Sequence, residues 1–308
     1  MTAVPFVDAH FHLWKLDRLR YPWLSPPFDD SGPNGSAAAI ARNYLVDDYR
    51  ADMADWNVVA AVHVEAGADA RDALNETIWL EQVGAMTNLP IAIVAYAALE
   101  DPQVERNLAA QAAHSRVRGI RQIVNWHADP ARSYTTMDLT VDDRWQRGFA
   151  ALAAYGLSFD LQCYPDQMSG LVNLFDRNPD VPVVINHLGM PVTTDAEGFA
   201  RWRSGMQALS ALESVSVKIS GLGFIHRAWT NESVRPFLTE ALELFGPERC
   251  MFASDTPTDK LFAPLDRYLA TYQAFSGALS PDDQLSMWCR NAARTYHLDL
   301  SVETSIDR

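Results

Sequence analysis

The segment VDAHFHL, residues 7–13, is a short apolar run that contains two histidines near its end, and it decides the predicted fold. Seven more short runs, rich in β-branched residues and bounded by turn or polar residues, begin near residues 59, 91, 117, 157, 183, 215 and 250. Their starts are about 26 to 52 residues apart, roughly the length of one strand and one helix. The chain therefore predicts eight strands that alternate with helices.

Helical patterns occupy the gaps between these runs. Apolar residues recur there at helical spacing, and several segments end at glycine or before proline. The segments are 73–88, 103–115, 142–156, 199–212 and 234–246, and a closing helix over 280–298 begins with Ser280 as its N-cap. In the first segment, one apolar face is expected to contain Leu74, Ile78, Leu80, Val83 and Met86.

Eight parallel strands that are buried on both faces predict a single-domain (β/α)8 TIM barrel over residues 1–308. An open, doubly wound α/β sheet is the alternative, but no glycine-rich phosphate-binding segment follows the first strand. Residues 21–36, YPWLSPPFDDSGPNGS, predict an extended loop after that strand. In a barrel, such a loop borders the mouth of the active site.

The composition limits the partners and the location of the protein. The 308 residues include 25 Lys and Arg against 39 Asp and Glu, so the net charge is −14. A surface this negative repels nucleic acid and anionic lipid headgroups, and neither is an expected partner. The N-terminal residues lack the pattern of a signal peptide or membrane span, which predicts a cytoplasmic protein, as an oligomer or a monomer. The three cysteines are far apart, so we expect no disulfide.

Polar side chains stand near the ends of the predicted strands. His10 and His12 are two positions apart on the first strand, so both leave the same face. An ordinary polar pair has the same spacing, but other polar residues stand where the remaining runs stop. Because a barrel brings the C-terminal ends of its strands to one mouth, these residues are expected to meet there. They are His63, Glu65, Arg121, Gln162, His187, Lys218 and Asp255.

Structural roles are also open to these residues. Asp255 could cap the following segment, His187 could be a buried histidine with satisfied hydrogen bonds, and Lys218 could extend to solvent. Independent core positions rarely share the end of a strand, which favours a functional role for the group. That role is favoured most for His10, His12, His187 and Asp255.

The His-x-His pair of the first strand, the histidine after the sixth and the aspartate after the eighth resemble the amidohydrolase superfamily. Further segments resemble the branch that contains sugar-lactone hydrolases and a pyrone-dicarboxylate lactonase. They are 8-DAHFHLW, 21-YPWL, 62-VHVEAG, 119-GIRQ, 186-NHLG, 246-GPERCMFASD and 291-NAARTYHL. The resemblance spans the whole chain, and it implies a (β/α)8 barrel that opens lactone rings.

The resemblance also implies a metal site. The expected ligands are His10, His12, His187 and Asp255. Superfamily members with two ions use a carboxylated lysine on strand four and a histidine on strand five. This chain has three lysines, none of them on strand four, and it has Asp160 and Gln162 on strand five. We therefore expect one divalent ion, with zinc as the first choice, or none.

A lactonase must polarise the ester carbonyl, activate water and protonate the leaving alkoxide. The three histidines, directly or through one metal ion, are expected to stabilise the carbonyl oxygen. Asp255 is expected to take the proton from water and then to pass it to the ring oxygen. The residues expected to hold substrate hydroxyls or a carboxylate are Arg121, Gln162, Lys218, His63 and Glu65.

Two other functions stay open. A metal-dependent decarboxylase of a small carboxylic acid has the same His-x-His, His and Asp arrangement, whereas 62-VHVEAG and 21-YPWL favour the lactonase. The other is a non-catalytic barrel that binds a sugar acid. Binding a polyol does not require a carboxylate beside three imidazoles, so Asp255 argues against that function.

Overall fold

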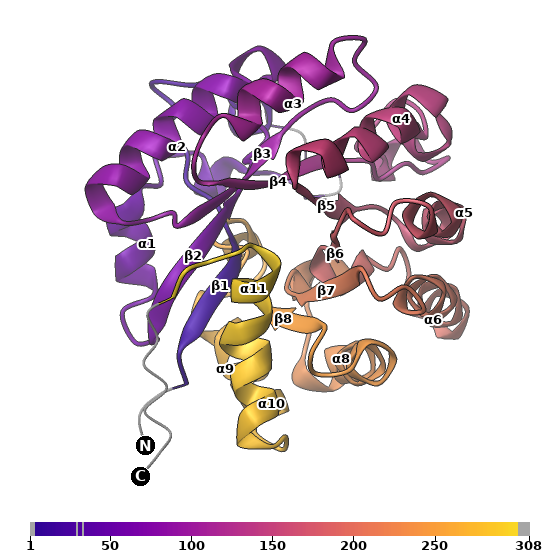
Figure 1. Ribbon diagram of the computed structural model, residues 1–308. Coiled ribbons are helices and arrows are strands. Elements are labelled where there is room, and N and C mark those ends of the chain that lie inside the picture. The colour runs from indigo at the N-terminus through magenta and orange to yellow at the C-terminus, as the bar shows by residue number, and fades with distance from the viewer. Residues whose placement is uncertain (1–3, 29, 33, 301–308) are drawn as a thin grey trace.

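Eight parallel strands form the centre of the molecule in the computed structural model, which describes residues 4–28, 30–32 and 34–300 (Figure 1). Each strand pairs with the next in sequence order, and a parallel bridge between Phe11 and Thr256 joins the last strand to the first. The predicted (β/α)8 barrel is confirmed, and the open sheet is excluded. The strands are β1 (Phe6–Phe11), β2 (Val58–Val64), β3 (Ala92–Tyr96), β4 (Val117–Ile123), β5 (Ser158–Gln162), β6 (Val183–Ile185), β7 (Val215–Ile219) and β8 (Cys250–Phe252).

Helices surround the barrel (Figure 1). The five helices predicted between strands form, but α6 and α8 begin at Ala196 and Asn231 rather than at 199 and 234. The reason is capping, because the side chains of Asp195 and Thr230 accept backbone N–H groups in the first turns. The predicted helices are α2 (Ala73–Thr87), α3 (Val104–Ala112), α4 (Asp143–Ala151), α6 (Ala196–Ser210) and α8 (Asn231–Phe245).

Four helices were not predicted, and the closing helix is divided. The additional helices are α1 (Val46–Asp52), α5 (Pro165–Asp176), α7 (Leu222–Ile225) and α9 (Leu265–Ser276). The closing segment consists of α10 (Pro281–Leu285) and α11 (Asn291–Thr295), joined by a π-helical turn over Ser286–Arg290. Ser280 caps this segment as predicted, because its side chain accepts the N–H group of Asp283.

The buried face of α2 differs from the predicted apolar face. Leu74 and Met86 are exposed, whereas Glu76, Trp79 and Leu80 are buried. The first turn of α2 packs against the end of β2, where a Glu76 carboxylate oxygen accepts the N–H group of Ala66. This contact turns a charged residue inward, and the apolar spacing of the helix could not indicate it.

The segment between β1 and β2 is the predicted extended loop at the C-terminal end of β1. It contains two short 3-10 turns, Pro22–Leu24 and Ala38–Ile40, followed by α1. Trp14 and Tyr44 pair through two backbone hydrogen bonds of 3.0 Å each, so the loop returns to the point where it leaves the barrel. The two hydrogen bonds join the beginning and the end of the loop, so the loop stays close to the mouth of the barrel.

Within the described residues, Cys163, Cys250 and Cys289 are buried and unpaired. No helix in that part of the chain is long and apolar enough to cross a membrane.

We predict that Gly148→Ala destabilises the barrel by about 1–3 kcal/mol, which is typical of overpacking. Gly148 lies in α4, and a Cβ atom there would come within 2.0 Å of the backbone oxygen of Leu99. Chemical denaturation measures the effect. Gly170→Ala in α5 is the control, since an added Cβ meets nothing within 4 Å and the helix gains about 0.5–1 kcal/mol. Equal stability of the two variants would contradict the close packing of α4 on the chain after β3.

Candidate active site

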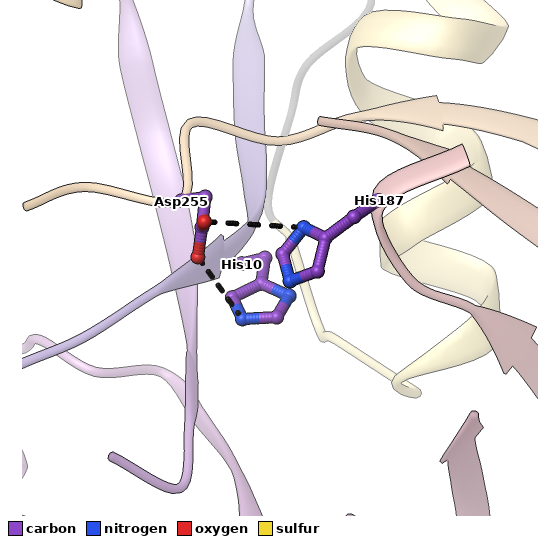
Figure 2. A group of neighbouring side chains, drawn as sticks. All are labelled: His10, His187 and Asp255. Atoms are coloured by element: carbon purple, nitrogen blue, oxygen red, sulfur yellow. Dashed lines mark ion pairs between the residues drawn. The ribbon is translucent and has the colours of Figure 1, made fainter. Parts of the chain in front are cut away.

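His10, His187 and Asp255 converge at the C-terminal ends of β1, β6 and β8 (Figure 2). One ligand atom from each of the three lies within 4.8 Å of the others, and all three residues are buried. Figure 2 shows the Asp255 carboxylate facing both imidazole rings, with Oδ1 3.5 Å from His10 Nε2 and Oδ2 3.9 Å from His187 Nδ1. Residues that are more than 240 positions apart thus meet because the barrel closes.

The backbone is unusual at two of these positions. His187 has φ of 52° and Asp255 has φ of 49°, in the left-handed region that non-glycine residues rarely adopt. The N–H group of Asp255 donates to the carbonyl of His10 at 2.8 Å, which fixes the end of β8 against β1. Strain of this kind persists where surrounding contacts determine the conformation, and it is common at functional sites.

His12 lies beside this group. Its Nε2 atom is 3.3 Å from His10 Nε2 and 3.2 Å from Asp255 Oδ1, and its Nδ1 atom is 2.8 Å from the carbonyl oxygen of Val64. Because a carbonyl oxygen only accepts, Nδ1 carries the proton and donates. His12 therefore presents the lone pair of Nε2 to the site.

The three histidines are neutral. Burial lowers the pKa of His12 to about 3 and that of His187 to about 4, and it lowers the pKa of His10 well below the ordinary range. Burial also raises the pKa of Asp255, while its interactions with His187, Arg121 and Lys218 and a hydrogen bond with Asp259 oppose that rise. Neutral imidazoles are the form that binds a metal ion.

The donor set fits a divalent ion. Two imidazoles and a carboxylate form a common ligand set for catalytic zinc, with a further position open for substrate. The Asp255 carboxyl is buried and shares a hydrogen bond with Asp259, a second buried carboxyl group, whose pKa is raised well above its ordinary value by burial and by the charge of Asp255. Two buried carboxyl groups in contact cannot both be ionised without a large cost, so they share a proton or lie near a cation. His10, His187 and Asp255 are therefore the residues that could hold the ion, with His12 adjacent.

A cavity of about 190 Å³ opens above these residues. Its floor contains the predicted residues His12, Arg121, Gln162, His187 and Asp255. Its walls contain residues that the sequence did not single out: Trp23, Asn34, Tyr134, Phe224 and Thr258. Asn34 and Tyr134 come from loops, Trp23 and Thr258 from short 3-10 turns, and Phe224 from the four-residue helix α7. No periodic pattern marks residues in such short segments as facing the cavity. We call this cavity the chamber.

Arg121 is engaged by protein groups. Its Nε atom donates to Glu65 Oε1 at 2.7 Å, Nη2 donates to the Glu65 carbonyl at 2.5 Å, and Nη1 donates to Gln162 Oε1 at 3.1 Å. Glu65 also accepts the N–H group of Gly67 at 2.8 Å. The positive charge at the chamber floor is thus neutralised by Glu65, and the structure brings Arg121, Glu65 and Gln162 into one network.

Lys218 and His63 lie behind the chamber wall. Lys218 is fully buried, forms an ion pair with Asp160 and has its Nζ atom 3.5 Å from His10 Nδ1. Tyr296 of the closing segment donates to the same Asp160 carboxylate at 2.9 Å. His63 has its Nε2 atom 3.2 Å from the Leu13 carbonyl. Neither side chain lines the chamber, so their position suits support of the site better than contact with substrate.

Glu76 is a second buried carboxyl group close to Glu65. Burial, and after it the negative charge of Glu65, raises the pKa of Glu76 to about 8. The folded state therefore keeps this proton at pH values where the unfolded chain has released it.

We predict that the contribution of Glu76 to the free energy of unfolding falls as the pH rises from about 4.5 to 8. The reason is that the folded state keeps the Glu76 proton across this range, whereas the unfolded chain releases it. Glu76→Gln should remove that part of the fall, since the amide resembles the protonated carboxyl. Denaturation at several pH values measures the slope. Glu105→Gln, at an exposed position on α3, should leave the slope unchanged. A wild-type slope in Glu76→Gln contradicts the assignment.

A barrel with histidines after its first and sixth strands and an aspartate after its eighth is the architecture of amidohydrolases. The amidohydrolase family model matches residues 7–298, and the chain belongs to this family.

Three similar proteins span nearly the same length. An uncharacterized protein of Sinorhizobium fredii, y4mH, is 38% identical over 97% of this chain and 100% of its own. An L-fucono-1,5-lactonase of Burkholderia multivorans is 29% identical over 95% of this chain and 96% of its own. A solved amidohydrolase structure from Burkholderia multivorans with bound zinc has a TM-score of 0.78 at 27% identity, covering 95% of this chain and 99% of that one.

Proposed function

We propose that this protein is a lactonase, a hydrolase that opens a cyclic ester. The observation that carries the proposal is the Asp255 carboxylate, which lines the chamber together with the neutral imidazoles of His12 and His187 and lies 3.5 Å from that of His10. This set provides an acceptor for a water proton beside imidazoles that could hold a divalent ion, and such an ion would stabilise an oxyanion. Similarity to an L-fucono-1,5-lactonase supports the same reaction class.

In the proposed reaction, the substrate carbonyl points at the floor of the chamber. Asp255 accepts a proton from water as the oxygen of that water attacks the carbonyl carbon, and a tetrahedral intermediate forms. Collapse of the intermediate breaks the bond between this carbon and the ring oxygen. Asp255 returns the proton to the ring oxygen, so one carboxylate acts first as base and then as acid.

His10, His187 and Asp255 would hold a divalent ion, for which zinc is the first choice. When bound, such an ion acts as a Lewis acid that polarises the substrate carbonyl. His12 keeps its lone pair directed at the same place, because its other nitrogen donates to Val64. The buried ring is held in one orientation and does not need to reorganise during the reaction.

The charge of the chamber favours an uncharged lactone. Arg121 is the cation among the described residues that line the chamber, and it already pairs with Glu65. Apart from a bound metal ion, a substrate carboxylate would lie near Asp255 without a guanidinium of its own, and buried charges need a partner.

A substrate panel tests the proposal. The panel contains six-membered sugar lactones, δ-valerolactone, a carboxylated pyrone and small aromatic acids. Acid release, followed with a pH indicator, should occur with the uncharged lactones, and carbon dioxide should not form from the acids. Carbon dioxide release without lactone hydrolysis would replace the lactonase with the decarboxylase.

We predict that Asp255→Asn lowers kcat on the best lactone by about 10²- to 10⁴-fold, because the amide cannot accept the water proton. Steady-state kinetics should place most of the loss in kcat rather than KM. Asp176→Asn, at an exposed position near the end of α5, is the control and should keep wild-type rates. Near wild-type turnover by Asp255→Asn would remove Asp255 from the central role.

We also predict one equivalent of tightly held divalent metal per chain after dialysis against zinc and then buffer. His10→Ala and His187→Ala should each lose most of it, whereas His114→Ala, outside the site, should keep it. Elemental analysis gives the stoichiometry. Two equivalents per chain would contradict a single site, and full activity after complete metal removal would mean that the imidazoles act as donors themselves.

A further inference from the structure

The walls of the chamber hold a polar pair that faces the catalytic floor and that the reaction above does not use. Tyr134 belongs to the loop after β4, and Asn34 belongs to the extended loop after β1. The Tyr134 hydroxyl donates to Asn34 Oδ1 at 2.6 Å, and both residues line the chamber. The contact therefore joins two loops, 100 positions apart, at the chamber wall.

Both residues are held in place by contacts outside the pair. The N–H group of Tyr134 donates to the carbonyl of Asn125 at 3.0 Å, which ties its loop back to the end of β4. Next to Asn34, the N–H group of Gly35 donates to the carbonyl of Gly32 at 2.9 Å. Backbone contacts thus position the two segments separately, and the hydrogen bond between the side chains joins them at the chamber wall.

The pair presents a donor next to an acceptor. Asn34 Oδ1 is occupied by Tyr134, which leaves the Asn34 amide hydrogens as donors and the lone pairs of the Tyr134 oxygen as acceptors. Burial raises the pKa of Tyr134 well above its ordinary value, so the phenol keeps its proton. A hydroxyl group both accepts and donates, and it matches this arrangement. A carboxylate only accepts, and a bare methylene does neither.

Trp23 and Phe224 supply apolar surface beside the pair. The Trp23 Nε1 group donates to the Ala66 carbonyl at 2.8 Å, so its polar edge is satisfied and its ring serves as wall. The chamber thus combines the reacting groups, apolar walls and one donor–acceptor pair in about 190 Å³, a size that suits one small ring.

We propose that Tyr134 and Asn34 determine substrate specificity by hydrogen-bonding a hydroxyl on the lactone ring while its carbonyl lies at Asp255. This proposal rests on the lactonase function. It assigns the pair a contact with substrate, whereas a purely structural pair would only join the two loops.

Two variants separate these roles. Tyr134→Phe removes the hydroxyl. Asn34→Asp keeps an oxygen that accepts from Tyr134, and so keeps the bridge, but it removes the amide donor. Tyr155→Phe is the matched control, because its hydroxyl donates to the Glu105 carbonyl far from the chamber. Thermal unfolding of each variant checks that the fold is intact.

The kinetic test compares the best hydroxylated six-membered lactone with δ-valerolactone, which lacks ring hydroxyls. Tyr134→Phe and Asn34→Asp should each lower kcat/KM about tenfold on the hydroxylated lactone and leave it unchanged on δ-valerolactone. Equal losses on both lactones, or loss in Tyr134→Phe alone, mean that the pair only joins the loops and overturn the proposal. No loss on either lactone overturns it as well.

A binding measurement keeps this test separate from the lactonase function. Calorimetry of 1,5-anhydroalditols, which keep the ring hydroxyls but lack the carbonyl, needs no turnover. Wild type should bind them more tightly than tetrahydropyran, and both variants should lose that preference. If wild type hydrolyses no lactone yet shows this pattern, the lactonase proposal fails and the hydroxyl contact stands. Absence of the preference in wild type would falsify the hydroxyl contact.

Discussion

The site depends on the closure of the barrel between its first and last strands. The hydrogen bond from the Asp255 N–H group to the His10 carbonyl, at 2.8 Å, holds the end of β8 against β1. The bridge between Phe11 and Thr256 continues this pairing by one step. Asp255, His10 and His12 all lie at this junction between β8 and β1. A small change in how the barrel closes would therefore move the three side chains relative to one another. The geometry of the candidate site is therefore a property of the whole barrel rather than of any local motif.

Closure of the barrel also buries charged side chains, and two buried cations form ion pairs with buried carboxylates. Arg121 pairs with Glu65, and Lys218 pairs with Asp160, all four side chains being almost completely inaccessible. An isolated ion at such depth is very unfavourable, so removing one partner of either pair costs more than the pair contributes. Asp255 differs, because the buried group that it shares a hydrogen bond with is a second carboxyl, Asp259, rather than a cation. Two adjacent carboxyls at this depth need a shared proton or a nearby cation, which is consistent with the metal site proposed above.

The strands and the floor of the site were predictable because periodic burial and strand ends leave a direct trace in the sequence. His10, His187 and Asp255 meet as their strand positions predicted. Strand position alone did not distinguish Lys218 and His63, which lie behind the wall, from Gln162, which lines it. The position of a residue at the end of a strand places its Cα atom at the mouth of the barrel. The direction of the side chain depends on which neighbouring group forms an ion pair or hydrogen bond with it. No sequence pattern indicated Tyr134 and Asn34, because contacts between loops follow no periodic spacing.

This division has a functional consequence. Residues on strands are held by the hydrogen-bonded barrel, and they suit chemistry that requires fixed geometry. Residues on loops can change while the barrel stays intact, and they suit recognition. The contact between Tyr134 and Asn34 couples the loops after β4 and β1, so neither loop can change length independently without losing it. The two proposals together predict that a relative with the same floor but other residues at these two positions hydrolyses lactones with a differently substituted ring.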